Sequence, residues 1–167
     1  MIDLLLVSMF PAAMALAAAS DLFTMTISNR LSIGLVAAFG VAAAASGLGA
    51  DAILMHLSAG FCMLAIAFVL FSFGWIGGGD AKLFAATAVW MGWPHLVEYV
   101  VWTGLIGGAL TLALLVVRQV PLPAGLQRQT WMARLHAADT GVPYGIALAA
   151  AGLVVYPHTE WMALLSR

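Results

Sequence analysis

The stretch of sequence that decides the fold is residues 53–80, which read ILMHLSAGFCMLAIAFVLFSFGWIGGGD. The part from Ile53 to Phe73 is almost entirely apolar, and a helix needs about 20 such residues to cross a bilayer. Three glycines follow, and the run ends on Asp80. The stretch therefore predicts a membrane-spanning helix that leads directly into a carboxylate at the membrane boundary.

The composition of the whole chain supports a membrane protein. Of its 167 residues, 64% are hydrophobic and only 8% are charged, whereas soluble domains are usually about 25% charged. The net charge of −1 excludes the basic surface that a nucleic-acid partner would need. The single cysteine, Cys62, lies in an apolar run, where we interpret it as a packing residue. No cysteine or histidine spacing indicates a metal site, and no cofactor is expected.

Apolar segments of similar length recur along the chain. Six spans are expected, at about 2–20, 31–49, 53–73, 81–93, 96–117 and 143–165. The first segment has no Lys or Arg before Arg30, so we interpret it as a retained helix and not as a signal peptide. We therefore expect an all-α polytopic bundle that forms a single domain over residues 1–167.

The basic residues predict how this bundle is oriented in the membrane. Five of the six fall in loops on one side, namely Arg30, Lys82, Arg118, Arg128 and Arg134. Only Arg167 falls on the other side. The positive-inside rule makes the first side cytoplasmic, which places the N-terminus outside. Asp21, which follows the first apolar segment, and Asp80 are then both expected at the cytoplasmic end.

The segment 118–142 is the only long loop between the expected spans. Pro121 and Pro123 interrupt any helix near its start. Beyond them, one apolar stripe is possible, made of Leu126, Trp131, Met132, Leu135 and Ala138. Arg128 and Arg134 would flank that stripe, so the segment predicts either a short basic helix on the inner membrane surface or a plain connecting loop.

The sequence excludes several kinds of hydrolytic chemistry and leaves the carboxylates. It contains no H-E-x-x-H zinc motif and no G-x-S-x-G nucleophile motif. The four histidines, His56, His95, His136 and His158, are scattered, and we interpret them as interface or loop residues. Asp21 and Asp80 adjoin helix ends on the predicted inner side. A carboxylate costs about 2.5–3.5 kcal/mol at mid-membrane and less near the ends, so each could also be a solvated flanking residue.

The glycines before Asp80 are the more informative feature. Gly77, Gly78 and Gly79 carry no side-chain bulk and allow another chain to approach closely, as when an extended peptide binds through backbone hydrogen bonds. The alternative is a flexible hinge between two helices. Lys82, two residues on, faces a different direction from Asp80 and is expected to anchor the helix at anionic headgroups.

Two aspartates at one depth of a membrane predict general acid–base catalysis of peptide hydrolysis. One ionised carboxylate would take a proton from a water molecule, and the other, protonated, would donate to the scissile carbonyl oxygen. Two close carboxylates in a low-dielectric site share a proton. The sequence does not assign the two roles between them.

On these residues the chain resembles a type IV prepilin peptidase, in its short CpaA/TadV-like form, which is a GxGD intramembrane aspartyl protease. Three stretches carry the resemblance: Gly77-Gly78-Gly79-Asp80-Ala81-Lys82-Leu83, Asp21 followed by Ile27-Ser28-Asn29, and Val142-Pro143-Tyr144-Gly145. Members of the family usually have Ile-Pro-Asn where this chain has Ile27-Ser28-Asn29. The third stretch could equally be simple helix initiation, since proline is favoured in a first turn.

The resemblance implies catalytic roles for Asp21 and Asp80. It also implies that a further set of residues shapes the site or binds substrate: Gly77, Gly78, Gly79, Lys82, Asn29, Pro143, Tyr144 and Gly145. The implied reaction removes the leader of prepilin-like proteins at the cytoplasmic face of the bacterial inner membrane. The chain lacks the cysteine-rich domain of longer members, so methyl transfer is not expected.

Three alternatives remain open on the sequence. The chain could be a GxGD protease with a different membrane substrate, or a small proton-coupled carrier that tolerates membrane-edge aspartates. It could also be a structural factor in pilus assembly with incidental aspartates. In that context Gly104 and Gly108 form a small-xxx-small pair, which we expect to serve packing within the bundle.

Overall fold

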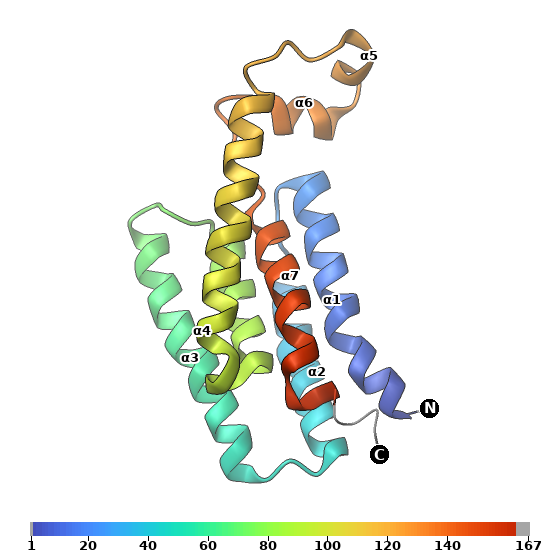
Figure 1. Cartoon of the computed structure of the whole chain (residues 1–167), viewed down its shortest axis with the longest axis vertical. Coiled ribbons are helices and arrows are strands. Elements are labelled where there is room, and N and C mark those ends of the chain that lie inside the picture. Colours follow the sequence, from blue (N-terminus) through green and yellow to red (C-terminus); the bar gives the residue numbers. More distant parts are fainter. Residues whose placement is uncertain (1, 163–167) are drawn as a thin grey trace.

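The protein is an α-helical bundle, seen in a computed structural model that describes residues 2–162 (Figure 1). Four helices are long and apolar enough to cross a membrane: α1 (Ile2–Thr24), α2 (Asn29–Ser46), α3 (Ala50–Ser72) and α4 (Gly78–Val117). Two short helices, α5 (Ala124–Gln127) and α6 (Thr130–His136), precede α7 (Tyr144–Val155), and a 3₁₀ turn (Tyr156–His158) follows it. Within residues 2–162 there is no β-strand. The prediction of an all-α membrane protein is therefore confirmed, whereas the count of six spans stays a prediction.

The expected fourth and fifth spans both lie within α4. This 40-residue helix is broken at Gly92, whose φ of 61° and ψ of 179° are not helical. Glycine alone adopts this backbone without a steric penalty, and Pro94 lies in the first turn of the second arm. The break falls two residues before the Pro94-His95 loop expected from the sequence, and it divides α4 into a first arm (residues 78–91) and a second arm (residues 93–117).

The expected sixth span, 143–165, is shorter in the structure. Its α-helical part ends at Val155, and the 3₁₀ turn takes in Pro157. Proline lacks a backbone N–H, so it cannot donate the hydrogen bond that would continue the α-helix. Residues 163–165 of this expected span, and Arg167, lie outside the described residues.

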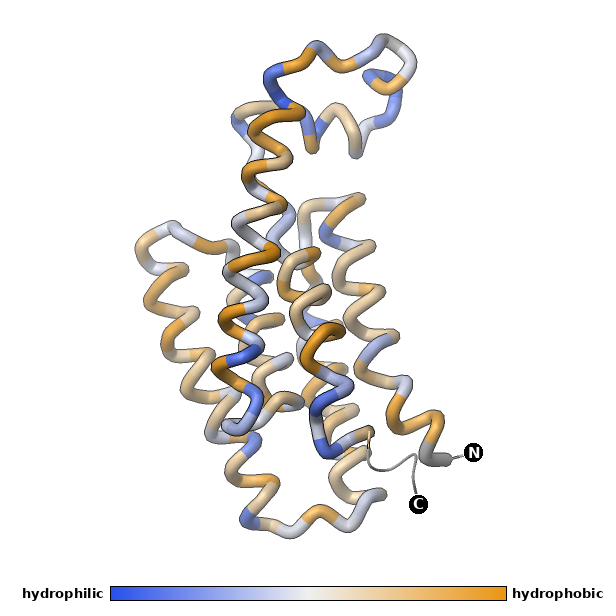
Figure 2. Tube along the Cα trace, viewed as in Figure 1, coloured by the Kyte–Doolittle hydropathy of each residue, from blue (hydrophilic) through white to orange (hydrophobic). Residues whose placement is uncertain are grey.

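The polar residues gather at the two ends of the bundle (Figure 2). One end, here called the aspartate end, is where α1 and α3 finish and α2, α4 and α7 begin. It holds Asp21 and Asp80, and also five basic residues: Arg30, Lys82, Arg118, Arg128 and Arg134. The opposite end holds Asp51, Glu98 and Glu160. Every Lys and Arg within residues 2–162 therefore lies at the aspartate end, and the orientation of this end in the membrane stays a prediction.

The core is built mainly of aromatic side chains toward the opposite end, here called the aromatic end. Phe10 of α1, Phe39 of α2, Trp90 of α4 and Trp161 are all at most 2% exposed. The Trp90 and Trp161 rings lie 5.1 Å apart, and the Trp161 Nε1–H donates to the Trp90 carbonyl oxygen at 2.9 Å. Such rings bury a large area each, so this cluster joins four parts of the chain.

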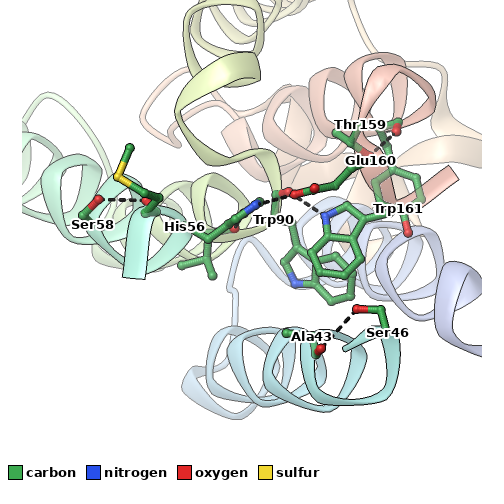
Figure 3. Close-up of polar contacts among 11 residues, drawn as sticks. Ala43, Ser46, His56, Ser58, Trp90, Thr159, Glu160 and Trp161 are labelled. Atoms are coloured by element: carbon green, nitrogen blue, oxygen red, sulfur yellow. Dashed lines mark hydrogen bonds and ion pairs between the residues drawn. The ribbon is translucent and has the colours of Figure 1, made fainter. Parts of the chain in front are cut away.

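A buried histidine completes the aromatic end (Figure 3). His56 of α3 places Nδ1 2.7 Å from the Val89 carbonyl oxygen and Nε2 2.7 Å from Glu160 Oε1. Because a carbonyl oxygen only accepts, Nδ1 carries a proton. The sequence interpretation of His56 as an interface residue is right, but its partner Glu160 lies 104 residues away and could not be foreseen.

The segment 118–142 is partly helical and is tied to the bundle. The Arg118 guanidinium donates to the carbonyl oxygens of Leu135 and Gly141, each at 2.9 Å. In α6, the Trp131 ring meets Phe23 of α1 edge-on at 5.4 Å. The predicted basic helix therefore exists over Thr130–His136 only. Leu126 belongs to the separate helix α5, and Ala138 lies beyond the end of α6.

The expectation for Gly104 and Gly108 is wrong. Both lie on the second arm of α4, and apart from adjacent residues and the backbone of α4 itself, no described heavy atom comes within 4 Å of the point where a Cβ would stand on either glycine. Neither residue therefore serves packing inside the bundle. Their positions leave an open strip on the surface of α4.

Candidate active site

Asp21 lies in the last turn of α1 and is almost completely buried, with 4% exposed. The helix ends at Thr24, and Met25 turns the chain with a positive φ of 54°. One carboxylate oxygen of Asp21 accepts the backbone N–H of Gly145 at 2.7 Å. Gly145 is in the first turn of α7, where backbone N–H groups lack helical partners. Asp21 therefore caps a helix to which it does not belong.

Gly145 must be a glycine for this contact to form. A Cβ at this position would stand 2.8 Å from Asp21 Oδ2 and 2.6 Å from Ile27 Cδ1. Pro143, just before α7, is fully buried, and its fixed φ suits a helix start. The Pro143-Tyr144-Gly145 stretch thus initiates a helix, as the simpler interpretation held, and also presents an N–H to Asp21.

Asp80 lies in the first turn of α4 and turns back over the start of its own helix. Gly77 is the residue that precedes α4, and its backbone N–H donates to the Asp80 carboxylate. A Cβ on Gly77 would stand 2.9 Å from Asp80 Oδ2. This is the side-chain half of a capping box, in which an acidic residue three positions into a helix satisfies the N-cap N–H.

The two aspartates come together at the aspartate end. They are close enough for their charges to interact, although 59 positions separate them in the sequence (80 minus 21). Each faces the N-terminus of a helix, Asp80 that of α4 and Asp21 that of α7. The positive end of a helix dipole favours a negative charge, so each helix N-terminus stabilises the carboxylate that faces it when that carboxylate is ionised.

The loop after Asp21 packs directly on the loop before Asp80. Gly79 lies against Ile27, with its Cβ position 3.2 Å from the Ile27 Cβ and 3.3 Å from the Ile27 carbonyl oxygen. Lys82 Nζ donates to Asn29 Oδ1 at 2.8 Å. Lys82 therefore joins the two motifs, a contact that the sequence did not indicate. Its expected place at lipid headgroups stays a prediction.

Ser28 explains how the chain tolerates the absence of a proline in its first motif. Its φ is −72°, close to the value of about −65° that proline imposes. The Ser28 hydroxyl also accepts the Leu31 N–H at 3.3 Å and so caps α2. Serine thus keeps the backbone shape that a proline would give and adds a hydrogen bond.

The remaining glycines and the tyrosine of the motifs also have defined neighbours. Gly78 lies against the Phe71 ring, since a Cβ on Gly78 would stand 3.3 Å from Phe71 Cε2. The Tyr144 hydroxyl fills the space beside Gly107, where a Cβ would overlap it. Sequence reasoning missed Gly107, Phe71 and Ile27 as parts of the site. Only Ile27 carried a signal, since it belongs to the first motif.

A cavity of about 850 Å³ opens beside Asp80. Its walls come from α3, both arms of α4 and the start of α7, and they include Asp80 and Tyr144 but not Asp21. A second groove, of about 720 Å³, lies between α2 and α3 and reaches Asn29 and Lys82. Within the described residues, no three His, Cys, Asp or Glu side chains are grouped as a metal site would require.

Comparison with known proteins identifies a family. The family model described as the type IV leader peptidase family matches residues 8–112, which is more than half of the chain and includes both aspartates. No curated protein and no solved structure matches the chain. The resemblance drawn from the motifs is therefore confirmed at the level of the family.

Proposed function

The chain belongs to the type IV leader peptidase family, and on that premise we propose that it is an aspartic endopeptidase of the membrane. Its substrates would be prepilin-like proteins, from which it removes the leader that precedes a hydrophobic helix. Asp21 and Asp80 would carry the chemistry. One observation supports this most: two carboxylates from distant motifs lie within electrostatic reach of each other, each at a helix N-terminus.

The proposed mechanism is general acid–base hydrolysis by the pair. One ionised aspartate takes a proton from a water molecule as the water oxygen bonds to the scissile carbonyl carbon. The other aspartate, protonated, gives its proton to the carbonyl oxygen. When the tetrahedral intermediate collapses, the C–N bond breaks, and the leaving amine takes the proton that the first aspartate had accepted from the water. The second aspartate takes a proton back from a hydroxyl of the intermediate, so that the new carboxyl group forms and the pair returns to its starting state. The apparent pKa values of such a pair belong to the two groups together, so either aspartate fits either role.

The surrounding residues would hold this pair in register. Gly145 and Gly77 each supply a backbone N–H that fixes one carboxylate. The Lys82–Asn29 hydrogen bond would keep the two motif loops together. These contacts would orient the carboxylates, and the correct orientation of reacting groups accounts for a large part of the rate enhancement of an enzyme.

The reaction would take place at the cytoplasmic face of a bacterial inner membrane. Five basic residues lie at the aspartate end, and basic loops stay on the cytoplasmic side. The segment 118–142 would help to position the substrate there. In the structure Arg134 reaches the Phe23 carbonyl oxygen at 3.4 Å, two residues beyond Asp21, so the segment lies over the end of α1.

A leader-cleavage assay tests the proposal. The chain is co-expressed with a prepilin-like protein, and wild type is compared with Asp21→Asn and Asp80→Asn. Asn keeps the size and polarity of Asp but cannot exchange a proton. Asp51→Asn, at the opposite end in the first turn of α3, is the matched control. We expect cleavage by wild type and Asp51→Asn and none by the other two at equal protein levels. Cleavage by either site variant at the wild-type rate would refute the pair.

A further inference from the structure

The cavity beside Asp80 is elongated along the bundle. On the second arm of α4 its lining runs from Val100 to Thr111, a distance of roughly 16 Å along a helix. On α3 it runs from Met63 to Leu70. Asp80 lies at one end of the cavity, because it is in the first turn of α4. The cavity therefore extends from the carboxylate into the part of the bundle that crosses the membrane.

Two helices face each other across this cavity. The α3 lining residues Met63, Ile66 and Leu70 follow the three- and four-residue spacing that places side chains on one helix face. The second arm of α4 contributes Thr103 and Gly104. The first arm of α4 lies between them in the chain and supplies Asp80 and Phe84, one turn apart. The start of α7 adds Tyr144 and Leu148, so the cavity is a groove lined by α3, both arms of α4 and α7.

The size of the groove fits part of a helix. Two turns of helix, roughly 10 Å across and 10 Å long, fill about 800 Å³, and the groove measures about 850 Å³. The lining is mainly apolar, and apart from adjacent residues and the backbone of α4 itself, no described atom lies within 4 Å of the Cβ position of Gly104. Small residues of this kind let two membrane helices approach closely.

We propose that this groove binds the hydrophobic helix of the substrate, with Gly104 as the point of closest approach. The inference rests on the proposed function and adds the place where the substrate is held. The substrate helix would lie between α3 and the second arm of α4. The segment that precedes it would then leave the groove beside Asp80, where the scissile bond must be. The groove would select substrates by the bulk of the helix side chains that face Gly104.

Gly104 and Gly108 offer a matched pair of variants. Both are exposed glycines on the same helix, one turn apart, with open space around the Cβ position, but only Gly104 lines the groove. Gly104→Leu and Gly108→Leu therefore add the same side chain and change helix propensity equally. We expect Gly104→Leu to lower kcat/KM for a prepilin-like protein by about tenfold or more, since the added side chain would overfill the contact between position 104 and the substrate helix. Gly108→Leu is expected to stay within about twofold of wild type.

A binding measurement separates this inference from the proposed function. In a Cys62→Ala, Asp80→Asn background, Gly104→Cys and Gly108→Cys are each tested for cross-linking to single cysteines along the hydrophobic segment of the uncleaved prepilin-like protein. Cross-links at 104 and none at 108 support the groove. Equal cross-linking at both positions, or cleavage by Gly104→Leu at the wild-type rate, overturns it while the proposed function stands. If wild type cleaves no prepilin-like protein, both fail, and a lipid becomes the better occupant of the groove.

Discussion

The two ends of this bundle differ in what surrounds their buried polar side chains. At the aromatic end, both ring nitrogens of His56 have partners and the rings of Trp90 and Trp161 pack together. At the aspartate end, Asp21 and Asp80 each accept a backbone N–H, and Asp80 opens into a cavity. The first end fixes the bundle and the second leaves room for another molecule.

The glycines differ between the ends in the same way. Gly92, at the aromatic end, is needed for its backbone conformation, because it breaks α4 beside the His56 ring. At the aspartate end, a Cβ on Gly145 would stand 2.8 Å from Asp21 Oδ2, and a Cβ on Gly79 would stand 3.2 Å from the Ile27 Cβ, so in each case the neighbour would have to shift. The comparison suggests that substitutions at the aromatic end change stability, whereas those at the aspartate end change activity.

Trp161→Ala should have the largest effect and should act on stability. Truncation of a buried Trp in a packed core costs about 3–5 kcal/mol, and Trp161 also loses its hydrogen bond to the Trp90 carbonyl oxygen. Thermal unfolding in detergent should show a lower Tm, by about 6–12 °C or more. Trp75→Ala is the control, because Trp75 is 73% exposed and its loss should leave the Tm nearly unchanged. Equal shifts for the two variants would contradict a rigid aromatic end.

Gly145→Ala should come next and should act on activity. The new methyl group displaces the Asp21 carboxylate or the Ile27 side chain, and a hydrogen bond to a charged group is worth about 1.5–3 kcal/mol. Leader cleavage should fall by about tenfold to a hundredfold with little change in Tm. Gly34→Ala, at a helical glycine with open space around it, should cleave normally. A fall in Tm without loss of cleavage would mean that Gly145 contributes to stability and not to activity.

His56→Leu should destabilise the aromatic end more modestly. It leaves the Val89 carbonyl oxygen without its side-chain partner and removes the contact with Glu160, a loss of about 1–3 kcal/mol. The change should appear in the Tm and not in the cleavage rate per folded molecule. His95→Leu is the comparison, since His95 lies 3.9 Å from Glu98 near the surface. If His56→Leu lost cleavage without losing stability, His56 would belong to the site.

Lys82→Met should have the smallest effect. It removes the hydrogen bond to Asn29, which is exposed and therefore worth less than a buried one, so cleavage should fall by only about twofold to fivefold. Asn29→Ala should give the same loss, and the double variant should lose no more than either single one. Additive losses would mean that the two residues act separately.

Charge reversal at Arg128 and Arg134 tests the role of the segment 118–142. If this segment positions the substrate, replacing both with Glu should raise KM while kcat stays the same. Arg118 is left intact, because its hydrogen bonds to Leu135 and Gly141 hold the segment in place. Undiminished cleavage by the double variant would show that the segment 118–142 does not position the substrate.

Much of the fold followed from hydrophobicity, because long apolar runs must become helices in a membrane. The break in α4 was placed two residues late, since Pro94 is visible in the sequence while the φ of Gly92 depends on packing against His56. The end of α7 and the short helices α5 and α6 depend on tertiary contacts in the same way. The sequence therefore predicted the membrane-spanning helices more accurately than the residues at which they begin and end.

The sequence predicted the residues of the candidate site but not the contacts between them. The motifs named Asp21, Asp80 and Gly145, yet nothing in the sequence showed that Asp21 caps α7 through Gly145. Likewise, nothing in the sequence showed that Lys82 donates to Asn29. Such pairings join residues far apart in the chain, and a single sequence carries no record of them.

The central claim is that Asp21 and Asp80 act as one unit, and a double-variant cycle tests it most directly. Leader cleavage by the purified protein would be measured for wild type, Asp21→Asn, Asp80→Asn and the double variant. Residues that act together give single losses about as large as the combined loss, so all three variants should retain the same residual rate. A wild-type rate in either single variant, or losses that multiply in the double variant, would contradict the claim.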